Sequence, residues 1–157
     1  MSSVSSVSQT LASQELFRPI DPRGPRVGAT ITTVVLALVL LGGGTGPALL
    51  LLAAQTLVFA LGATRGPGAS PYAWVFRRLV RPRLAPPTEL EDSRPPRFAQ
   101  TVGLGFAVVA LLGFAAGLGV VGLVATGFAL AAALLNAVFG FCLGCEIHLL
   151  LQRATAR

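Results

Sequence analysis

Four apolar segments without a single charged residue limit what this chain can fold into. They cover residues 27–41, 47–63, 98–115 and 118–141. A helix needs about 20 apolar residues to cross a bilayer, and none of the four segments shows the polar face of a surface helix. Hydrophobic residues make up 54% of the chain and charged residues 11%, whereas about a quarter is charged in soluble domains. The sequence therefore predicts an all-α integral membrane protein with four transmembrane helices.

The connecting segments are polar or rich in proline. Residues 1–20 form a serine-rich tail that is expected to be disordered. Prolines 19, 22 and 25 are expected to exclude a regular helix over residues 17–26. In the central connection, apolar residues recur at helical spacing over residues 71–81 with arginines on the other side, which predicts an interfacial amphipathic helix. Residues 87–97 follow as a Pro-rich acidic linker.

The sequence contains an internal repeat. The motif Asp-Pro-Arg-Gly-Pro-Arg at residues 21–26 returns as Asp-Ser-Arg-Pro-Pro-Arg at residues 92–97. We call the shift in residue number that takes residue 21 to residue 92 the repeat offset. The pattern predicts two parallel repeats over residues 21–86 and 98–157, each a helical hairpin followed by an interfacial segment. Without gaps, this register aligns Cys142 with Pro71 and Cys145 with Trp74. The fourth helix is expected to continue through both cysteines to about residue 151.

The charges predict how the chain is oriented. All 12 basic residues are arginines in the N-terminal arm, the central connection or the C-terminus, and both outer turns are uncharged. The positive-inside rule then predicts that both termini and the central connection are cytoplasmic. The expected location of the chain is the inner (plasma) membrane. Because the arginines flank apolar segments and do not line one polar face, nucleic acid is not an expected partner. The expected partner is the lipid bilayer.

Near the C-terminus lies the one stretch that offers chemistry. Cys142 and Cys145 have the C-x-x-C spacing of a redox dithiol, in which one thiolate attacks and the second thiol resolves the mixed disulfide. The reducing cytoplasm argues against a purely structural disulfide. Glu146 or His148 could accept a proton, although a neighbouring carboxylate opposes thiolate formation. Cys142, Cys145 and Glu146 are therefore the candidate catalytic residues.

Other interpretations of this stretch stay open. Cys142, Cys145 and His148 could ligate a metal ion with a fourth ligand from elsewhere, or the cysteines could simply be small buried residues. Gly140 and Gly144 form a pair of small residues that should let another backbone approach. No resident cofactor is expected, and a quinone is an electron acceptor that such a dithiol could use.

Four arginines occupy equivalent positions in the two repeats: Arg23, Arg26, Arg94 and Arg97. If the repeats pack about a two-fold axis, these side chains could meet and bind a small oxyanion. The alternative is that they only anchor the membrane ends of the helices.

Four stretches carry a family resemblance: PRGPRVGA, WVFRRLVRPRLAPPTELED, PPRFAQTVGLGF and LLNAVFGFCLGCEIHLLLQR. They resemble the actinobacterial family of integral membrane proteins catalogued as domain of unknown function 4395 (DUF4395), over residues 17–153. The resemblance implies an association with thioredoxin-like proteins and thiosulfate sulfurtransferases, and it includes Cys142, Cys145 and Glu146 in the motif. His148 stands where relatives are expected to carry an aromatic residue, which argues against an essential base or metal ligand there.

The leading prediction for function is thiol–disulfide exchange or sulfur relay at the cytoplasmic membrane face. One alternative is a carrier for a small sulfur oxyanion such as thiosulfate, which would use the four arginines. Another is a non-catalytic membrane anchor for a sulfurtransferase or thioredoxin-like partner. Whether the chain is an enzyme is left open. Four short spans enclose little volume, so transport would favour a homodimer.

Overall fold

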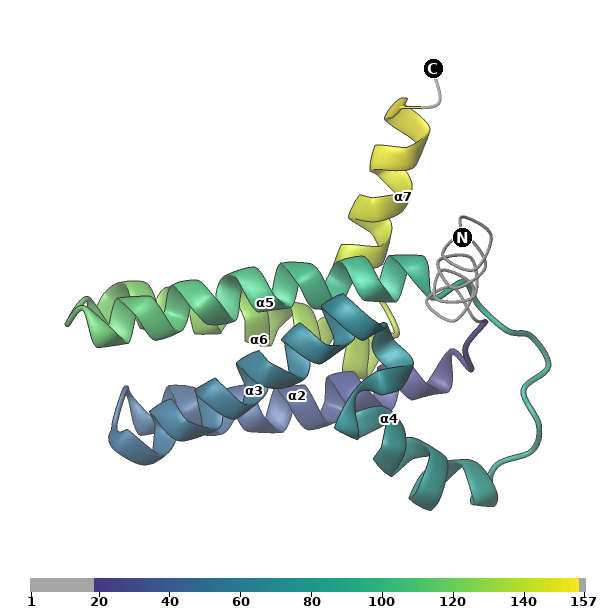
Figure 1. Ribbon diagram of the computed structural model, residues 1–157, viewed down its shortest axis with the longest axis horizontal. Coiled ribbons are helices and arrows are strands. Elements are labelled where there is room, and N and C mark those ends of the chain that lie inside the picture. Colours follow the sequence, from purple (N-terminus) through teal and green to yellow (C-terminus); the bar gives the residue numbers. More distant parts are fainter. Residues whose placement is uncertain (1–18, 156–157) are drawn as a thin grey trace, which may run out of the picture.

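The computed structural model describes residues 19–155, so most of the tail predicted to be disordered lies outside the described part. Four long helices run side by side: α2 (Arg23–Gly42), α3 (Gly46–Arg65), α5 (Arg94–Ala115) and α6 (Gly119–Phe139) (Figure 1). Each has 20 to 22 residues and is apolar enough to cross a membrane. At 1.5 Å per residue this is about 30 Å, the thickness of the hydrocarbon core. The predicted all-α class with four candidate spans is confirmed.

Two of these helices begin earlier than predicted. α2 starts at Arg23 and α5 at Arg94, so the predictions of no helix through residue 26 and of a linker through residue 97 are wrong. Pro25 and Pro95 lie in the first helical turn. The N–H groups of that turn have no acceptor within the helix, so a proline there sacrifices no hydrogen bond.

The core of the bundle combines large side chains from one pair of helices with alanines from the other. α2 packs mainly against α6 and α3 against α5, and α5 also contacts α6. The buried core residues are Leu36, Val39, Leu52, Phe59, Ala107, Ala110, Ala125 and Ala129. Small residues let helix backbones approach closely where no water is available to drive association. Many leucines and valines on the outside are exposed, as the surface of a lipid-facing bundle requires.

A series of hydrogen-bonded polar side chains crosses the interior of the first half. Gln55 is only 1% exposed, and its Nε2 donates to Thr32 Oγ1 at 3.4 Å. The hydroxyl of Tyr72 donates to Gln55 Oε1 at 2.7 Å. These contacts join α2, α3 and the segment after α3. Gln55 is therefore an interhelical hydrogen-bond partner.

Short helical elements gather at one end of the bundle. After α3 come a 3₁₀ turn (Pro67–Ala69), α4 (Pro71–Val75), a π-helical turn (Phe76–Val80) and a second 3₁₀ turn (Arg81–Arg83); α7 (Leu143–Thr155) follows α6. We call this end the arginine end and the opposite one the turn end. Figure 1 shows α4 and α7 on different sides of the arginine end, with α7 projecting across the direction of the long helices. The helix predicted over residues 71–81 is present, and its interfacial position stays a prediction.

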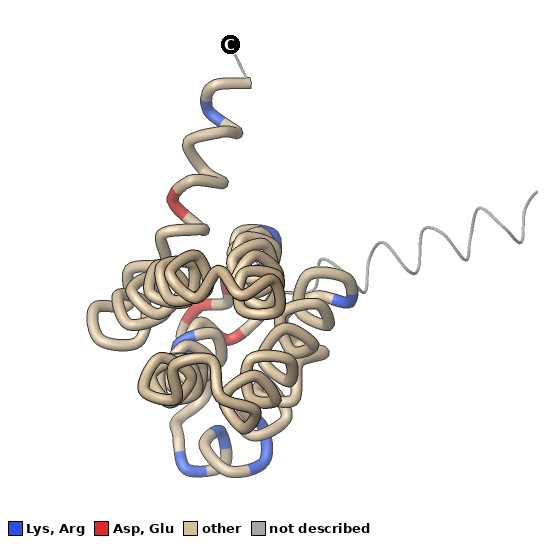
Figure 2. The backbone as a smooth tube through the Cα atoms, turned by 90° about the vertical axis from the view of Figure 1, so that its left-hand side faces the viewer, with Lys and Arg blue, Asp and Glu red and all other residues tan. Residues whose placement is uncertain are grey.

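The turn end carries no charge. Its two connections are the uncharged glycine turns between α2 and α3 and between α5 and α6. Figure 2 looks onto this end, and the turns facing the viewer are uncoloured, whereas the blue and red residues lie elsewhere. The bundle is therefore polarised along the direction of its helices.

The predicted continuous fourth helix is wrong. α6 ends at Phe139, and α7 begins only at Leu143. Gly140 adopts a left-handed φ of 67°, which glycine tolerates and other residues rarely do. Its N–H donates to Asn136 O at 3.1 Å and so closes α6. The chain turns here, and the cysteines leave the membrane-spanning helix.

An isolated antiparallel bridge joins the two halves of the chain. Ile20 and Glu91 each donate their N–H to the carbonyl oxygen of the other at 2.9 Å. These two residues are equivalent under the repeat offset. Asp21 and Asp92 follow them, and each carboxylate accepts the N–H of the residue two positions later. Two segments far apart in sequence therefore make the same local structure at the start of each half.

Candidate functional site

The turn after Gly140 places Cys142 at the N-terminal end of α7. Its sulfur accepts the N–H of Cys145 at 3.3 Å, and its carbonyl oxygen accepts the N–H of Glu146 at 3.0 Å. Cys142 therefore occupies the N-cap position, where a serine or aspartate oxygen usually accepts such a bond. The unpaired N–H groups and the dipole of a helix N-terminus favour negative charge at this position.

Cys142 and Cys145 are joined by a disulfide with a Cα–Cα distance of 5.2 Å. That separation is ordinary for disulfides. Both residues are half-buried, so they are neither sealed in the core nor fully in solvent. The structure thus brings together the two sulfurs that the C-x-x-C spacing predicted as a pair, in their oxidised state.

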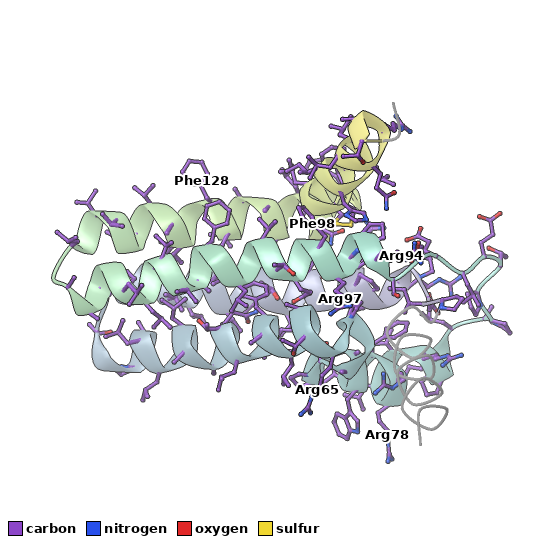
Figure 3. All side chains as sticks on the ribbon, turned by 45° about the horizontal axis from the view of Figure 1, so that its top comes forward. Arg65, Arg78, Arg94, Arg97, Phe98 and Phe128 are labelled. Carbon is purple, nitrogen blue, oxygen red and sulfur yellow. A yellow bond between two sulfur atoms is a disulfide. The ribbon has the colours of Figure 1, made fainter. Side chains whose placement is uncertain are left out.

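A close backbone contact holds the start of α7 against α5. A Cβ built on Gly144 would lie 2.6 Å from the Cα of Ala99, so a side chain at this position requires the helices to move. The predicted close approach of another backbone is confirmed for Gly144, whereas Gly140 serves the turn instead. Next to this contact, the ring centroids of Phe98 and His148 are 5.3 Å apart, and Figure 3 shows Phe98 at the base of α7.

The polar neighbours of the disulfide differ in their surroundings. Glu146 is exposed in the first turn of α7. His148 is half-buried, and its Nε2 lies 3.0 Å from Gln152 Nε2. Within residues 19–155 no group of three His, Cys, Asp or Glu side chains has the geometry of a metal site. The contacts of His148 with Phe98 and Gln152 account for its position without a metal ion.

Arg26 reaches from α2 to the turn that precedes the cysteines. Its Nε donates to Ala137 O at 3.2 Å and its Nη2 to Val138 O at 3.0 Å. The last carbonyls of a helix have no partner within it, and a guanidinium can satisfy two of them at once. The same guanidinium lies 3.9 Å from a Cβ built on Gly140. Arg26 therefore fixes the end of α6 from which the cysteine turn departs.

Arg97 makes the corresponding contact in the other direction. Its Nε donates to Ala63 O at 2.7 Å and its Nη2 to Thr64 O at 3.2 Å, both in the last turn of α3. Arg26 and Arg97 are equivalent under the repeat offset. The arginine of each half thus caps the second long helix of the other half, an arrangement that we call the crossed caps.

The four arginines predicted to bind an oxyanion are engaged with different segments. Arg26 and Arg97 form the crossed caps, and Arg23 Nη1 donates to Ala85 O at 2.9 Å. Arg94 Nε lies 3.9 Å from the carboxylate of Asp92. The structure gives these side chains separate backbone or carboxylate partners, and an anion shared among them stays a prediction.

The capping position of Cys142 was not predicted from the sequence. Gly140 was the available signal, because a glycine after the last apolar turn commonly ends a helix. Ser70, the N-cap of α4, accepts the N–H of Ala73 through Oγ at 3.1 Å. By helix position Cys142 therefore corresponds to Ser70, and the ungapped alignment of Cys142 with Pro71 is wrong by a single position.

An open groove of about 590 Å³ lies between α5 and α6. All the residues that line it are apolar: Val102, Gly105, Phe106, Val109, Val120, Val121, Val124, Ala125 and Phe128. The rings of Phe106 and Phe128 stack at 6.1 Å, and Phe128 stands on the outer side of α6 in Figure 3. The groove contributes no polar group, and a quinone as electron acceptor stays a prediction.

Comparison with known proteins gives one match. The model of the family described as Domain of unknown function (DUF4395) matches residues 20–153, which includes all four long helices and both cysteines. No curated protein and no solved structure matches the chain. The geometry of the site therefore has to carry any statement about activity.

Proposed function

The chain belongs to the DUF4395 family, and from this premise we propose that it exchanges thiols and disulfides, or relays sulfur, through Cys142 and Cys145 at the cytoplasmic membrane face. One observation carries the proposal: Cys142 caps α7 and its sulfur accepts the N–H of Cys145 at 3.3 Å. A helix N-terminus is where reactive cysteines of C-x-x-C motifs gain thiolate character. Cys142 is therefore the attacking residue and Cys145 the resolving residue.

In the exchange reaction, the Cys142 thiolate attacks one sulfur of a partner disulfide and releases the other as a thiolate. The Cys145 thiolate then attacks Cys142 Sγ, closes the Cys142–Cys145 disulfide and releases the second partner thiolate. Two electrons pass from this dithiol to the partner disulfide, and the reverse sequence returns them.

Sulfur relay uses the same two thiols. Cys142 takes the terminal sulfur of a donor persulfide and releases the donor thiolate. Attack of Cys145 on Cys142 Sγ then releases that sulfur as hydrosulfide and leaves the disulfide. The sulfane sulfur is reduced and the dithiol is oxidised, which gives the bond observed in this structure.

The position of the dithiol supports action at the membrane surface. α7 lies against the start of α5, at the arginine end and away from both outer turns. The positive-inside rule places this end in the cytoplasm. A soluble thioredoxin-like protein or sulfurtransferase is then the kind of partner that can reach a half-buried sulfur. The contacts of Arg23, Arg26 and Arg97 with backbone carbonyls give the oxyanion carrier less support.

Competitive alkylation tests which sulfur attacks. The reduced protein is treated at pH 7 with limiting iodoacetamide, and the modified cysteine is identified by mass spectrometry. We expect Cys142 to be modified first and much faster than glutathione under the same conditions. Preferential modification of Cys145, or rates no faster than glutathione at both positions, would contradict the assignment.

Two serine variants test the reaction itself. Cys145→Ser should trap a mixed disulfide between Cys142 and a thioredoxin-like partner, because the resolving thiol is missing, whereas Cys142→Ser should trap none. A membrane-impermeant maleimide should label the reduced dithiol in inside-out vesicles and not in right-side-out vesicles. The opposite labelling pattern would place the site on the other side of the membrane.

A further inference from the structure

A second site is formed by the first half of the molecule together with the start of α5, and it shares no residue with the disulfide. An open cavity of about 940 Å³ is formed by the start of α2, the turn after α3, α4 with its π-helical turn, and α5. Its wall includes Gly24 and Gly28 of α2, which leave room beside Phe76 and Tyr72. The cavity is at the arginine end, at the depth where the long helices stop.

Positive charge dominates the lining of this cavity. Arg65, Arg77 and Arg81 line it, and Asp21 is the one acidic residue among the described lining. Arg77 Nη1 donates to Gly68 O at 2.8 Å, which holds this guanidinium at the cavity wall. Guanidinium groups match the geometry of phosphate oxygens and can bind two of them at once. The charge favours an anionic ligand.

Gln100 places a second requirement on the ligand, which is a hydrogen-bond donor. It reaches the cavity from α5, and its Oε1 is buried with no hydrogen-bond partner within residues 19–155. Its amide packs closely on Gly62 of α3, within 2.9 Å of a Cβ built there. A buried acceptor without a donor costs folding free energy, and phosphate oxygens cannot supply that donor. The ligand that satisfies the site therefore carries a hydroxyl or amine besides its anionic group.

The rest of the wall combines the hydroxyl-bearing residues Thr64, Ser70, Tyr72 and Ser93 with an apolar part. Phe76 is buried, and Pro67 and Leu90 also line the cavity. A ligand with an acidic end, a hydrogen-bond donor and an apolar part matches an anionic phospholipid with a hydroxylated head group. Such head groups lie at the ends of membrane-spanning helices, which is the depth of this cavity.

The second half keeps little of this charge. Under the repeat offset Arg65 corresponds to Asn136. In the register set by the caps Ser70 and Cys142, Arg77 corresponds to Leu149 and Arg81 to Arg153. Two of the three guanidiniums are therefore replaced by groups that carry no charge, and the full arginine cluster belongs to the first half, as the dithiol belongs to the second.

We infer that this cavity binds a phosphate ester that also bears a hydroxyl or amine, and that its source is an anionic phospholipid of the surrounding leaflet. Arg65, Arg77 and Arg81 hold the phosphate, and Gln100 Oε1 accepts a hydrogen bond from the head group.

Trp74 provides the measurement, because it is the only tryptophan and lies on α4 beside the cavity. The full-length protein in neutral detergent is titrated with phosphatidylglycerol and, separately, with phosphatidylcholine, and Trp74 emission is recorded. We expect saturable binding of phosphatidylglycerol only. Arg65→Gln and Arg81→Gln should each weaken it about fivefold, the effect of about 1 kcal/mol per arginine. Gln100→Leu should weaken it as well.

Arg153→Gln is the matched control, because it removes the same charge from α7, outside the cavity. Equal weakening by Arg153→Gln and Arg65→Gln would show only general attraction and would overturn the site. So would equal binding of phosphatidylcholine and phosphatidylglycerol. Glycerol 3-phosphate is titrated in parallel. If it binds with the same dependence on Arg65 and Arg81, the site takes a soluble phosphate ester and the lipid source is wrong. Unchanged thermal unfolding of each variant confirms that it is folded.

Discussion

The starts of α4 and α7 are built alike and differ in the atom that caps them. Ser70 Oγ accepts the N–H of Ala73 at 3.1 Å, and Cys142 Sγ accepts the N–H of Cys145 at 3.3 Å. In the first half the cap is an oxygen with a structural role. In the second half the same position holds a sulfur, and the residue three positions on supplies its partner. In the proposed function, the capping site of the second half acts as a redox site because both of its positions carry thiols.

The two halves also differ in how closely the capped helix packs. In the first half, a Cβ built on Gly28 of α2 would lie an ordinary 3.8 Å from Tyr72 Cβ. In the second half, one built on Gly144 of α7 would meet the backbone of Ala99 at 2.6 Å. The dithiol therefore stands on a helix whose position is fixed more tightly than that of α4.

The largest effect is expected from transferring the dithiol to the first half. The double variant Ser70→Cys/Ala73→Cys should form a second disulfide at the start of α4, since the capping geometry already brings these positions together. Mass spectrometry after cleavage between the halves should find both disulfides. Because Ser70 is only 7% exposed, the new pair should be reduced more slowly than Cys142–Cys145. Two free thiols at 70 and 73 under oxidising conditions would show that the two caps are not equivalent.

Gly144→Ala should destabilise the protein by about 1–3 kcal/mol, because the new Cβ overlaps the Ala99 backbone. Gly28→Ala is the matched variant and should be neutral or slightly stabilising, since its Cβ has room and alanine favours a helix. Thermal unfolding in detergent measures both. Similar losses in the two variants would mean that α7 is not held by close backbone contact.

Variants of the two crossed-cap arginines should distinguish an effect on protein stability from an effect on the reactivity of Cys142. Arg97→Gln and Arg26→Gln should each cost about 1–2 kcal/mol of stability, because two helix-end carbonyls lose a charged donor. Arg26→Gln alone should also slow alkylation of Cys142, since only Arg26 holds the end of α6 beside the cysteine turn. Equal alkylation rates in the two variants would restrict Arg26 to a structural role.

The smallest effect concerns alkaline pH. Burial raises the pKa of Tyr72 above its ordinary value. The folded state therefore holds this proton more tightly than the unfolded state. The resulting stabilisation is complete below about pH 10 and is lost as pH rises through the folded-state pKa. Tyr72→Phe should remove this dependence and cost about 0.6 kcal/mol at pH 7 through the lost bond to Gln55. If the Tyr72→Phe variant loses as much stability at alkaline pH as the unchanged protein, that loss comes from other groups.

Much of the fold could be predicted because it depends on composition and spacing. Uninterrupted apolar segments predict spanning helices, and a polar residue such as Gln55 within one predicts an interhelical bond. The candidate site was harder to predict from the sequence, because its geometry depends on one backbone angle. A helical pattern continues through Gly140 in sequence, and only the left-handed conformation of that residue makes Cys142 an N-cap. The partners of Arg26 could not be predicted either, since they lie in α6, in the other half of the chain.

The bridge between Ile20 and Glu91 has a consequence for the origin of the molecule. If the two halves are related by a two-fold axis, a residue that pairs with its own equivalent under the repeat offset lies on that axis. Two separate copies of a single hairpin could make this contact with each other, and the crossed caps as well. Such a self-associating hairpin would need no covalent link to form the bundle. Fusing the copies into one chain would then free each half to diverge, one towards thiols and the other towards arginines.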